Sequence, residues 1–423
     1  MAGELAIWLY GDRVALVDRV RGRPGLTYTE DALDRYPLGT PLLSLSLPVT
    51  RRRYSQGTVL PFLDGLLPEG AARRAIAREV GIRQGDTFGL VAALGRDCAG
   101  AVVVQDADDP PSPRPTVASA ERLGEEAIGE LLRNLRSAPL GAGGRTRVSL
   151  GGVQEKLLLT RLRDGSWGRP VDGTPSTHIL KPEVAGFPHI VANEAFCMRV
   201  ARRLGAEVAT VATADAAGRR TIVVERYDRV VAADGSVERI HQEDLCQATR
   251  TEPEAKYEED GGPSLRQIAE ILQSVATPES LERFMQAAAL NVLLGNGDAH
   301  GKNFSLLHRP SGALALAPLY DLACTLPYGG DRLAMRIDGV QRIEDVTGDR
   351  LVAETKRWGA SAARAARALA ELVAGAPAAL EAAREETPEV PAALVTTIEG
   401  QLRRLQPGAP SRSRAQPRPA ARR

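Results

Sequence analysis

Apolar and polar positions at the start of the chain follow patterns typical of both strands and helices. Residues 5–19 and 40–49 carry short apolar runs and alternation that predict strands, whereas residues 60–81 repeat apolar positions at helical spacing. A further apolar strand is expected at residues 101–105. Together these elements predict a small α+β domain over residues 1–105.

A linker is expected next, because residues 106–119 are rich in Pro, Asp and Ser and cannot continue regular structure. A helix over residues 120–137 leads into a glycine-rich loop, and a strand follows that loop. A second strand at residues 177–181 and an amphipathic helix in HIVANEAFCMRVARRLGA come after it. We expect residues 120–230 to form one unit of the fold.

Helices dominate the rest of the ordered chain. Apolar residues recur at helical intervals in residues 264–295 and again in residues 347–405, which predicts a helical lobe over residues 231–405. The segment HQEDLCQATR predicts the start of a helix, with Glu243 and Asp244 in its first turn.

Composition narrows the class of protein. Lys+Arg (54) and Asp+Glu (53) nearly cancel, so the surface as a whole lacks the basic excess of a dedicated nucleic-acid binder. The cysteines are far apart in the sequence, which argues against a disulfide framework and a zinc site. No apolar run of about 18 residues and no signal pattern occur. We expect a cytoplasmic protein without membrane contact, ending in a disordered basic tail over residues 406–423.

Lysine is scarce among the basic residues. Only five of the 54 are lysine, and the others are arginine. Surface positions tolerate arginine, but a site that needs a compact ammonium does not, so the remaining lysines are candidates for function. They stand at positions 156, 181, 256, 302 and 356.

Three residues near position 300 indicate the chemistry. Asp298 follows an apolar helix and Gly-Asn-Gly, Asn303 stands five residues later, and a predicted hairpin of two short strands leads to Asp321. Phosphoryl transfer from ATP needs a carboxylate that accepts the hydroxyl proton and oxygen ligands that hold magnesium. The spacing matches the kinase pattern D-x-x-x-x-N. The alternative for Asp298 and Asn303 is a role as turn formers or helix caps.

A glycine-rich loop and a lysine at a strand end are candidates for phosphate binding. RVSLGGVQEK places Ser149, Gly151, Gly152 and Lys156 between two predicted strands, where backbone N–H groups can approach a phosphate. No Walker motif occurs. Lys181 ends the strand THILK, as the phosphate-binding lysine of kinases does. The glycines could equally form a simple turn, and Lys181 could be an ordinary strand-edge residue.

Two further groups could complete a nucleotide site. Glu194, in the helix after Lys181, could pair with that lysine, although the helix dipole also favours a glutamate there. A β-branched strand ends at residues 225–227, where backbone groups released from the sheet could bind an adenine ring. A salt-bridged turn is the alternative for this segment.

The order and wording of these segments resemble the HipA family of toxin kinases. The resemblance spans roughly residues 40–330 and implies an α+β, two-lobed kinase-like fold, related to phosphoinositide kinases, with a small N-terminal α+β domain and a helical C-terminal lobe. The matching stretches are LSLSLPVTRRRYSQGTVLPFLDGLLPEG, VSLGGVQEK, THILKPE, NEAFCMRVARRLG, VVERYDR, HQEDLCQ, GNGDAHGKNFSLL and LAPLYDLACTLPYG.

The resemblance also implies roles for individual residues. Asp298 would be the catalytic base, Asn303 and Asp321 the Mg²⁺ ligands, and Ser149 the serine that family members phosphorylate on themselves. The residues implied to hold ATP are Gly151, Gly152, Val153, Gln154, Glu155 and Lys156 in the phosphate loop, Lys181, the hinge residues Glu225, Arg226 and Tyr227, and His300, Gly301 and Lys302 beside the phosphates.

The implied function is that of a serine/threonine-protein kinase acting as the toxin of a type II toxin-antitoxin system. Its partners would be a helix-turn-helix antitoxin like HipB, operator DNA mainly through that antitoxin, and a protein substrate. The best-known substrate in the family is glutamyl-tRNA synthetase. Two alternatives remain: a catalytically silent kinase-fold scaffold that regulates an antitoxin on DNA, and a small-molecule phosphotransferase on the same fold. The alanine-rich helical end and the basic tail match no family motif.

Overall fold

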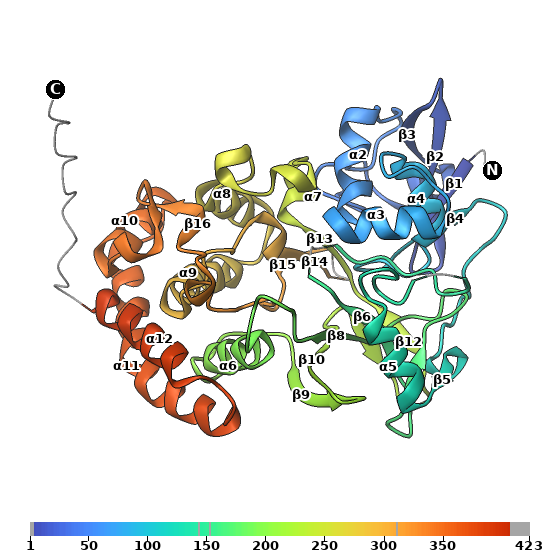
Figure 1. The fold of residues 1–423 in the computed structure, drawn as a ribbon. Coiled ribbons are helices and arrows are strands. Elements are labelled where there is room, and N and C mark those ends of the chain that lie inside the picture. Colours follow the sequence, from blue (N-terminus) through green and yellow to red (C-terminus); the bar gives the residue numbers. More distant parts are fainter. Residues whose placement is uncertain (1–3, 143, 152–153, 310–311, 407–423) are drawn as a thin grey trace, which may run out of the picture.

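The computed structural model describes residues 4–142, 144–151, 154–309 and 312–406, which form a small N-terminal domain, a lobe built on a six-stranded sheet, and a helical lobe. In Figure 1 the N-terminal domain lies at the upper right, the six-stranded sheet lies below it, and the helical lobe lies to the left. Buried apolar side chains of the described residues gather into three clusters, the largest of which fills the helical lobe. The predicted basic tail lies outside the described residues after Gln406.

The N-terminal domain is an antiparallel sheet of order β3-β2-β1-β4, packed against short helices. Leu5, Ile7 and Leu9 alternate along the first strand and join one apolar cluster, as strand geometry requires. The predicted helical stretch over residues 60–81 forms two helices, since Pro68 interrupts it. The elements are β1 (Glu4–Leu9), β2 (Asp12–Val20), β3 (Arg23–Tyr28), α1 (Glu30–Arg35), α2 (Gln56–Gly65), α3 (Gly70–Glu79), α4 (Thr87–Leu94) and β4 (Val102–Asp106).

The prediction of a strand over residues 40–49 is wrong, because this segment is an irregular loop. Leu43 and Leu47 are buried, which accounts for the apolar pattern. Ser44 and Leu45, which lie between them, form hydrogen bonds to a side chain instead of to a neighbouring strand. The hydroxyl of Ser44 and the backbone N–H of Leu45 donate to the carboxylate of Glu243, at 2.5 and 2.9 Å.

The second lobe is a six-stranded sheet of order β5-β7-β6-β8-β10-β9. Alternation along β10 turns Val223 toward α5, while Ile222 and Val224 join the large cluster with α6. The helix predicted over residues 120–137 is shorter, because its first residues form the strand β5. The sequence predicts the glycine-rich loop that contains Gly151 between two strands, but the element before it is the helix α5. The elements are β5 (Glu121–Leu123), α5 (Glu125–Arg133), β6 (Leu157–Arg161), β7 (Trp167–Arg169), β8 (His178–Pro182), α6 (Ile190–Arg203), β9 (Val211–Ala216) and β10 (Arg219–Glu225).

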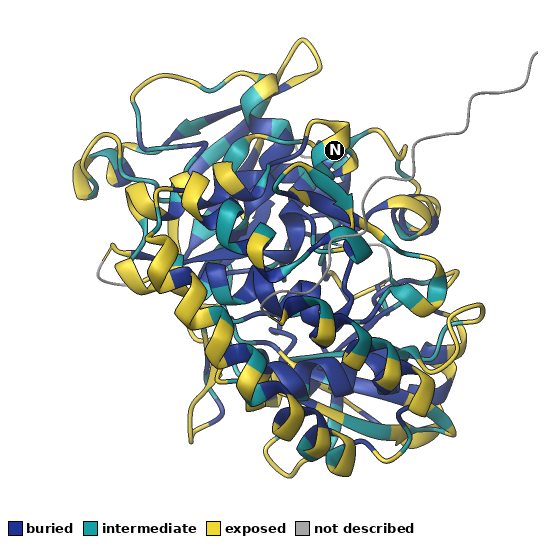
Figure 2. Ribbon diagram, turned by 90° about the vertical axis from the view of Figure 1, so that its left-hand side faces the viewer, coloured by how far each residue is buried: buried dark blue, intermediate teal, exposed yellow. Residues whose placement is uncertain are grey.

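The helical lobe surrounds α9, a long helix whose C-terminal half is buried. Figure 2 shows helices that are buried on their inner sides and exposed on their outer sides. Among the helices that the structure describes, none is both long enough and apolar enough to cross a membrane. The elements are β11 (Arg229–Val231), β12 (Val237–Arg239), β13 (His241–Asp244), α7 (Leu245–Thr249), α8 (Leu265–Val275), α9 (Pro278–Leu294), β14 (Ser305–His308), β15 (Leu314–Leu316), β16 (Arg332–Ile337), β17 (Val340–Arg342), α10 (Gly348–Arg357), α11 (Ala362–Glu386) and α12 (Ala392–Leu405).

The segment HQEDLCQATR differs from the prediction of a helix start at Glu243. Residues up to Asp244 form strand β13, which pairs with β14, and the helix begins only at Leu245. Asp244 caps that helix by accepting a hydrogen bond from the N–H of Gln247 at 2.8 Å. Glu243 therefore belongs to a strand, and its side chain is free to reach Ser44.

A largely buried group of charged residues joins the N-terminal domain to the rest of the protein. We call this group the Asp97 cluster. Its members are Asp97, Arg226, Asp228, Arg229 and Arg239. Arg229 lies 2.9 Å from Asp97, and Arg226 lies 2.8 Å from Asp228. Arg239 is 3.4 Å from Asp97. Burial alone would raise the pKa of Asp97, but the three arginines hold it below its usual value.

Candidate active site

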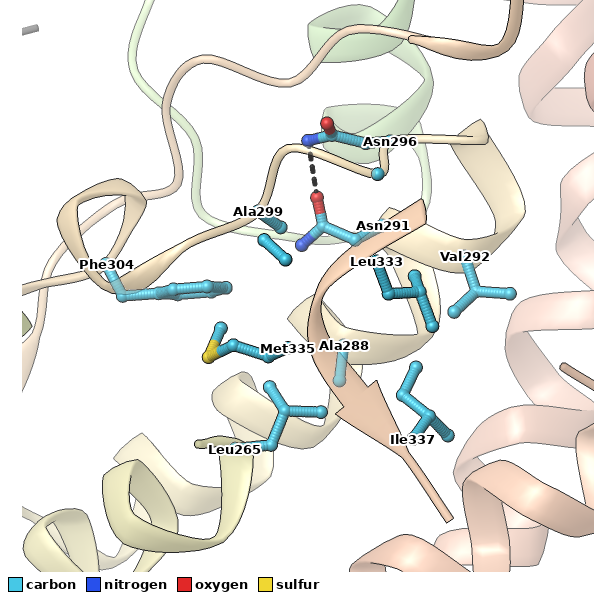
Figure 3. A pocket seen from close by; sticks show the side chains of 12 residues that line it. Leu265, Ala288, Asn291, Val292, Asn296, Ala299, Phe304, Leu333, Met335 and Ile337 are labelled. Atoms are coloured by element: carbon cyan, nitrogen blue, oxygen red, sulfur yellow. Dashed lines mark hydrogen bonds between the residues drawn. The ribbon is translucent and has the colours of Figure 1, made fainter. Parts of the chain in front are cut away.

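The loop that carries Asp298 is fixed by its own backbone and by the helix before it. Helix α9 ends at Leu294 and is capped by Gly295, whose φ of 71° suits glycine; a Cβ there would lie 2.8 Å from Leu326. Asn296 donates to Asn291 at 2.8 Å, as Figure 3 shows, and accepts from the N–H of Asp298 at 3.1 Å. An apolar cavity of about 20 Å³ lies behind the loop. The two hydrogen bonds of Asn296 thus hold the loop that carries Asp298.

Asp298 presents its carboxylate to solvent at the surface of this loop. Its Oδ1 accepts a hydrogen bond of 2.7 Å from the hydroxyl of Tyr257, which also packs edge-on against His300. The surrounding protein reduces hydration and raises the pKa of Asp298, the Tyr257 hydrogen bond lowers it, and nearby Asp321 raises it further. An exposed carboxylate with a raised pKa is suited to accepting a proton from an alcohol.

Asn303 and Asp321 lie on either side of the hairpin formed by β14 and β15. The hydroxyl of Tyr320 donates to the carbonyl oxygen of Lys302 at 2.7 Å, which joins the residue before Asp321 to the residue before Asn303. Asp321 has a φ of 59°, in the left-handed region that few residues other than glycine adopt. This hydrogen bond and this backbone turn bring the two oxygen-bearing side chains to the same loop region.

The strand-end lysine contacts two carboxylates at once. Lys181, on β8, lies 2.8 Å from Glu194 on α6 and 2.6 Å from Asp321. Burial lowers the pKa of Lys181, but the two carboxylates outweigh it and hold the lysine charged. Lys181 in turn lowers the pKa of Asp321. The pairing of Lys181 with Glu194 that the sequence suggests is therefore present.

Asn303 and Asp321 carry the oxygen-ligand chemistry that a magnesium ion bound together with phosphate uses. Asn303 donates from Nδ2 to the carbonyl oxygen of Asp298 at 3.2 Å, so its own amide oxygen points elsewhere. The described residues contain no group of three or more His, Cys, Asp or Glu arranged to hold a metal. Mg²⁺ is usually held by one or two carboxylates plus substrate phosphates, so an Asp and an Asn suffice.

Four of the five lysines gather around these residues. Lys156 donates to the carbonyl oxygen of Gly151, and burial together with nearby Lys181 lowers its pKa to about 8. Lys302 lies 2.7 Å from Asp244 and 3.8 Å from Glu69. Lys256 lies 2.9 Å from Glu69 and completes the group, while Lys356 is exposed on α10.

The sequence motifs did not identify Glu69, Lys256 or Tyr257 as part of this site. Glu69 comes from the N-terminal domain and is buried between the lysines. The scarcity of lysine is the signal that could have identified Lys256. No periodic pattern or motif spacing marks the other two.

Some of the predicted nucleotide-binding residues face the protein interior. The side chain of Arg226 belongs to the Asp97 cluster, and Lys302 donates to protein oxygens, including the carbonyl of Gly65 at 3.4 Å. Glu155, by contrast, is half-buried and pairs with the exposed Arg136 at 2.8 Å. These contacts would have to change for the side chains to reach a ligand.

Others lie at the site or beyond the described residues. Glu225 is exposed at the end of β10, and the ring of Tyr227 stacks on Tyr320 with centroids 5.9 Å apart. Gly152 and Val153 lie outside the described residues, whereas Gln154 is half-buried beside them. Gly301 donates its N–H to the carbonyl of Lys256 at 3.3 Å.

The surroundings of Ser149 and His300 bear on the roles predicted for them. Ser149 is fully buried, and its hydroxyl donates to the carbonyl oxygen of Leu66 at 2.6 Å. The Nδ1 of His300 is buried without a hydrogen-bond partner among the described residues, and burial lowers the pKa of this ring to about 3. The ring is therefore neutral, and its buried Nδ1 lacks the partner that buried polar groups usually have.

The fold and this arrangement define a two-lobed kinase-like protein of the α+β class, and comparison with known proteins gives its family. The family model of the HipA-like C-terminal domain matches residues 148–380, and that of the HipA N-terminal domain matches residues 5–105. The chain belongs to the HipA family of kinases.

Individual relatives agree with this assignment. A protein of Sinorhizobium fredii named "Putative kinase Y4mE" is 42% identical over 342 residues, which cover 79% of this chain and 80% of the relative. The serine/threonine-protein kinase toxin HipA of Shewanella oneidensis is 33% identical over 298 residues, 66% of each chain. The structure of HipA from S. oneidensis MR-1, solved with HipB and operator DNA, matches with a TM-score of 0.81 and 26% identity over 94% of this chain and 95% of that one.

Proposed function

We propose that this protein is an ATP- and magnesium-dependent serine/threonine-protein kinase that acts in the cytoplasm as the toxin of a type II toxin-antitoxin system. The observation that carries the proposal is the contact of Lys181 with both Glu194 and Asp321, in the site that holds Asp298. A lysine paired with a helix glutamate, a magnesium-binding aspartate and a catalytic aspartate are the parts that kinases use.

Each residue has a defined task in the proposed reaction. Lys181 binds the α- and β-phosphates, and Asn303 and Asp321 hold magnesium, which neutralises charge on the phosphates when it is bound. Asp298 orients the serine or threonine hydroxyl of the substrate and accepts its proton. The unused Nδ1 of His300 is available to the phosphates.

One solved relative supports the proposed antitoxin partner. The match to a HipA solved with HipB and operator DNA supports a HipB-like helix-turn-helix antitoxin, with DNA contacted mainly through it. The substrate is proposed to be a protein of the translation machinery, with glutamyl-tRNA synthetase as the first candidate to test.

Transfer of labelled γ-phosphate from ATP with magnesium, to the protein itself and to candidate substrates, tests the proposal. Asp298→Asn should abolish transfer but keep nucleotide affinity, because the base acts mainly in the transition state. Asp321→Asn should weaken magnesium-dependent nucleotide binding. Asp234→Asn, in an exposed turn, is the matched control and should behave like the wild type.

Two outcomes would contradict this proposal. A wild-type protein that transfers no phosphate but forms a stable complex with its antitoxin would replace this proposal with the silent-scaffold alternative. Near wild-type turnover in Asp298→Asn would show that Asp298 is not the base.

A further inference from the structure

Lys256 is a buried lysine beside Asp298 that belongs to none of the phosphate-binding motifs. Its carbonyl oxygen accepts a hydrogen bond from the N–H of Gly301, at 3.3 Å, and the next residue, Tyr257, bonds to Asp298 at 2.7 Å. The backbone carbonyl of Lys256 and the side chain of Tyr257 thus both bond to the loop that carries the proposed base.

The segment around Lys256 is also held from its outer side. Glu258 accepts from the backbone N–H of Arg336 on β16 at 2.6 Å, and Glu259 pairs with Arg332 at 2.7 Å. The N–H of Gly262 closes a turn on the carbonyl of Tyr257 at 2.8 Å. Lys256 therefore extends from a rigid segment rather than from a free loop.

The ammonium of Lys256 has donors to spare among the described residues. It donates to Glu69 at 2.9 Å and lies 5.8 Å from the ring centroid of Tyr257. Lys302, by contrast, has three protein oxygens within 3.8 Å, from Asp244, Gly65 and Glu69. An ammonium has three N–H donors. Lys302 uses two of them in hydrogen bonds to Asp244 and Gly65, whereas Lys256 uses one, to Glu69, among the described residues.

The charge of Lys256 acts on the centre of the site. After burial, Lys256 is the strongest influence that lowers the pKa of His300, and it also opposes the increase in the pKa of Asp298. Both effects indicate that the positive charge of Lys256 lies close to Asp298 and His300.

The type of residue also points to function rather than to domain contact alone. Where the N-terminal domain is joined to the other lobes by the Asp97 cluster, the cations are arginines. At Glu69, between the same two parts of the protein, the chain keeps lysine despite its strong preference for arginine. A compact ammonium suits contact with a phosphate oxygen in a confined space.

We propose that Lys256 is a second phosphate-binding lysine, which contacts the γ-phosphoryl group during transfer, and that Glu69 is a positioning residue that holds its ammonium in the site. This inference rests on the proposed kinase function. The substrate hydroxyl oxygen forms a bond to the γ-phosphorus while the bond from that phosphorus to the β–γ bridging oxygen breaks. The electron pair leaves with ADP, and the hydroxyl proton goes to Asp298. Lys256 keeps its proton and balances charge on the transferring oxygens.

The test compares Lys256→Met with Lys356→Met, which removes the exposed lysine of α10. Lys256→Met should lower kcat by about 100-fold, in the range measured for losing one donor to a developing charge. Its affinity for ADP with magnesium should stay within about twofold of wild type, whereas its affinity for ATP should fall several-fold, because only ATP has a γ-phosphate. Lys356→Met should leave all three quantities unchanged. Equal losses for ATP and ADP, or wild-type turnover, would restrict Lys256 to a role in domain contact.

Removing Lys256 leaves the buried Glu69 carboxylate with less compensating charge, so the single variant could fail to fold. The double variant Glu69→Gln/Lys256→Met removes both charges and should fold with the same low kcat. Glu69→Gln alone should lower kcat about tenfold and should add nothing in the Lys256→Met background, as expected for residues that act through one another. An equal effect of Glu69→Gln in both backgrounds would overturn its positioning role.

The two hypotheses fail in different ways. If the wild-type protein transfers no phosphate from ATP, the proposed function itself is wrong. If the wild type transfers phosphate and Lys256→Met does so at the same rate with the same preference for ATP over ADP, only the inference about Lys256 is wrong.

Discussion

The hydroxyl of Tyr257 lies 2.7 Å from Oδ1 of Asp298, so the proposed catalytic base is held by a residue 41 positions earlier in the chain. The ring of Tyr257 also packs edge-on against His300, with centroids 5.2 Å apart. A single tyrosine thus contacts both Asp298 and His300 and orients their side chains.

Tyr257→Phe removes this hydrogen bond and keeps the ring. A hydrogen bond to a charged group contributes about 1.5–3 kcal/mol, so the variant should turn over at least about tenfold more slowly. Nucleotide affinity should not change, because the Tyr257 hydroxyl contacts the carboxylate of Asp298 and is not proposed to contact the phosphates. Steady-state kcat and a binding titration measure the two quantities. Faster turnover would show instead that the hydroxyl blocks Asp298 until substrate displaces it.

Lys181→Ala should lose more affinity for ATP than for adenosine, because the proposed partner of Lys181 is phosphate. It should also destabilise the fold by about 3–5 kcal/mol, because Glu194 is left buried without its cation. The double variant Lys181→Met/Glu194→Gln should regain much of that stability without regaining ATP affinity. Lys181→Arg should be damaging as well, since a planar guanidinium fits differently. Equal losses for ATP and adenosine would indicate a folding defect alone.

Asp97→Asn should destabilise the protein by about 3–5 kcal/mol, because it leaves the buried arginines of the Asp97 cluster short of a counter-charge. The cluster also makes stability depend on pH. Because the pKa of Asp97 is lower in the folded protein than in the unfolded chain, its contribution is fully present above about pH 4 and is lost as the pH falls through the lower, folded-state value.

Denaturant unfolding between about pH 5 and pH 2 measures this contribution, with Asp97→Asn losing less stability than wild type on acidification. Asp12→Asn, which breaks an exposed pair with Arg35, should cost less than about 1 kcal/mol at any pH in this range. Identical acid sensitivity in the wild type and in Asp97→Asn would contradict the assignment.

Phosphorylation of Ser149 should switch the enzyme off. The hydroxyl is buried against Leu66, so a phosphate, with a charge of about −1.5 to −2, cannot be accommodated there and must move the loop outward. Arg147, exposed two residues earlier, could then pair with it. Intact mass after incubation with ATP and magnesium should show one added phosphate that is absent in Asp298→Asn, and peptide mapping should place it on Ser149. Modification of another serine only, or normal ATP binding by the phosphorylated protein, would contradict this mechanism.

Local sequence patterns predicted the parts of the site that come from regular elements. The hairpin signal between Asn303 and Asp321 and the strand ending at Lys181 appear in the structure where the patterns place them. They could be read from sequence because their spacing is set by short-range geometry.

Contacts between distant segments could not be predicted in this way. Glu69 and Lys256 are 187 residues apart, and both lie outside strands and α-helices, so no periodicity links them. The strand expected at residues 40–49 fails for a similar reason: hydrogen bonds from Ser44 and Leu45 to Glu243, 199 residues away from Ser44, replace the pairing that a strand would need.

The Asp97 cluster connects the N-terminal domain to the rest of the protein independently of the peptide segment at residues 106–119. Four buried charges and the partly buried Arg239, together with Glu69 among the lysines, hold the first hundred residues against the rest of the protein through non-covalent contacts. The peptide connection at 106–119 is therefore not what keeps these parts together. Proteolytic cleavage within it would leave two fragments that migrate as one particle under native conditions and separate only after denaturation.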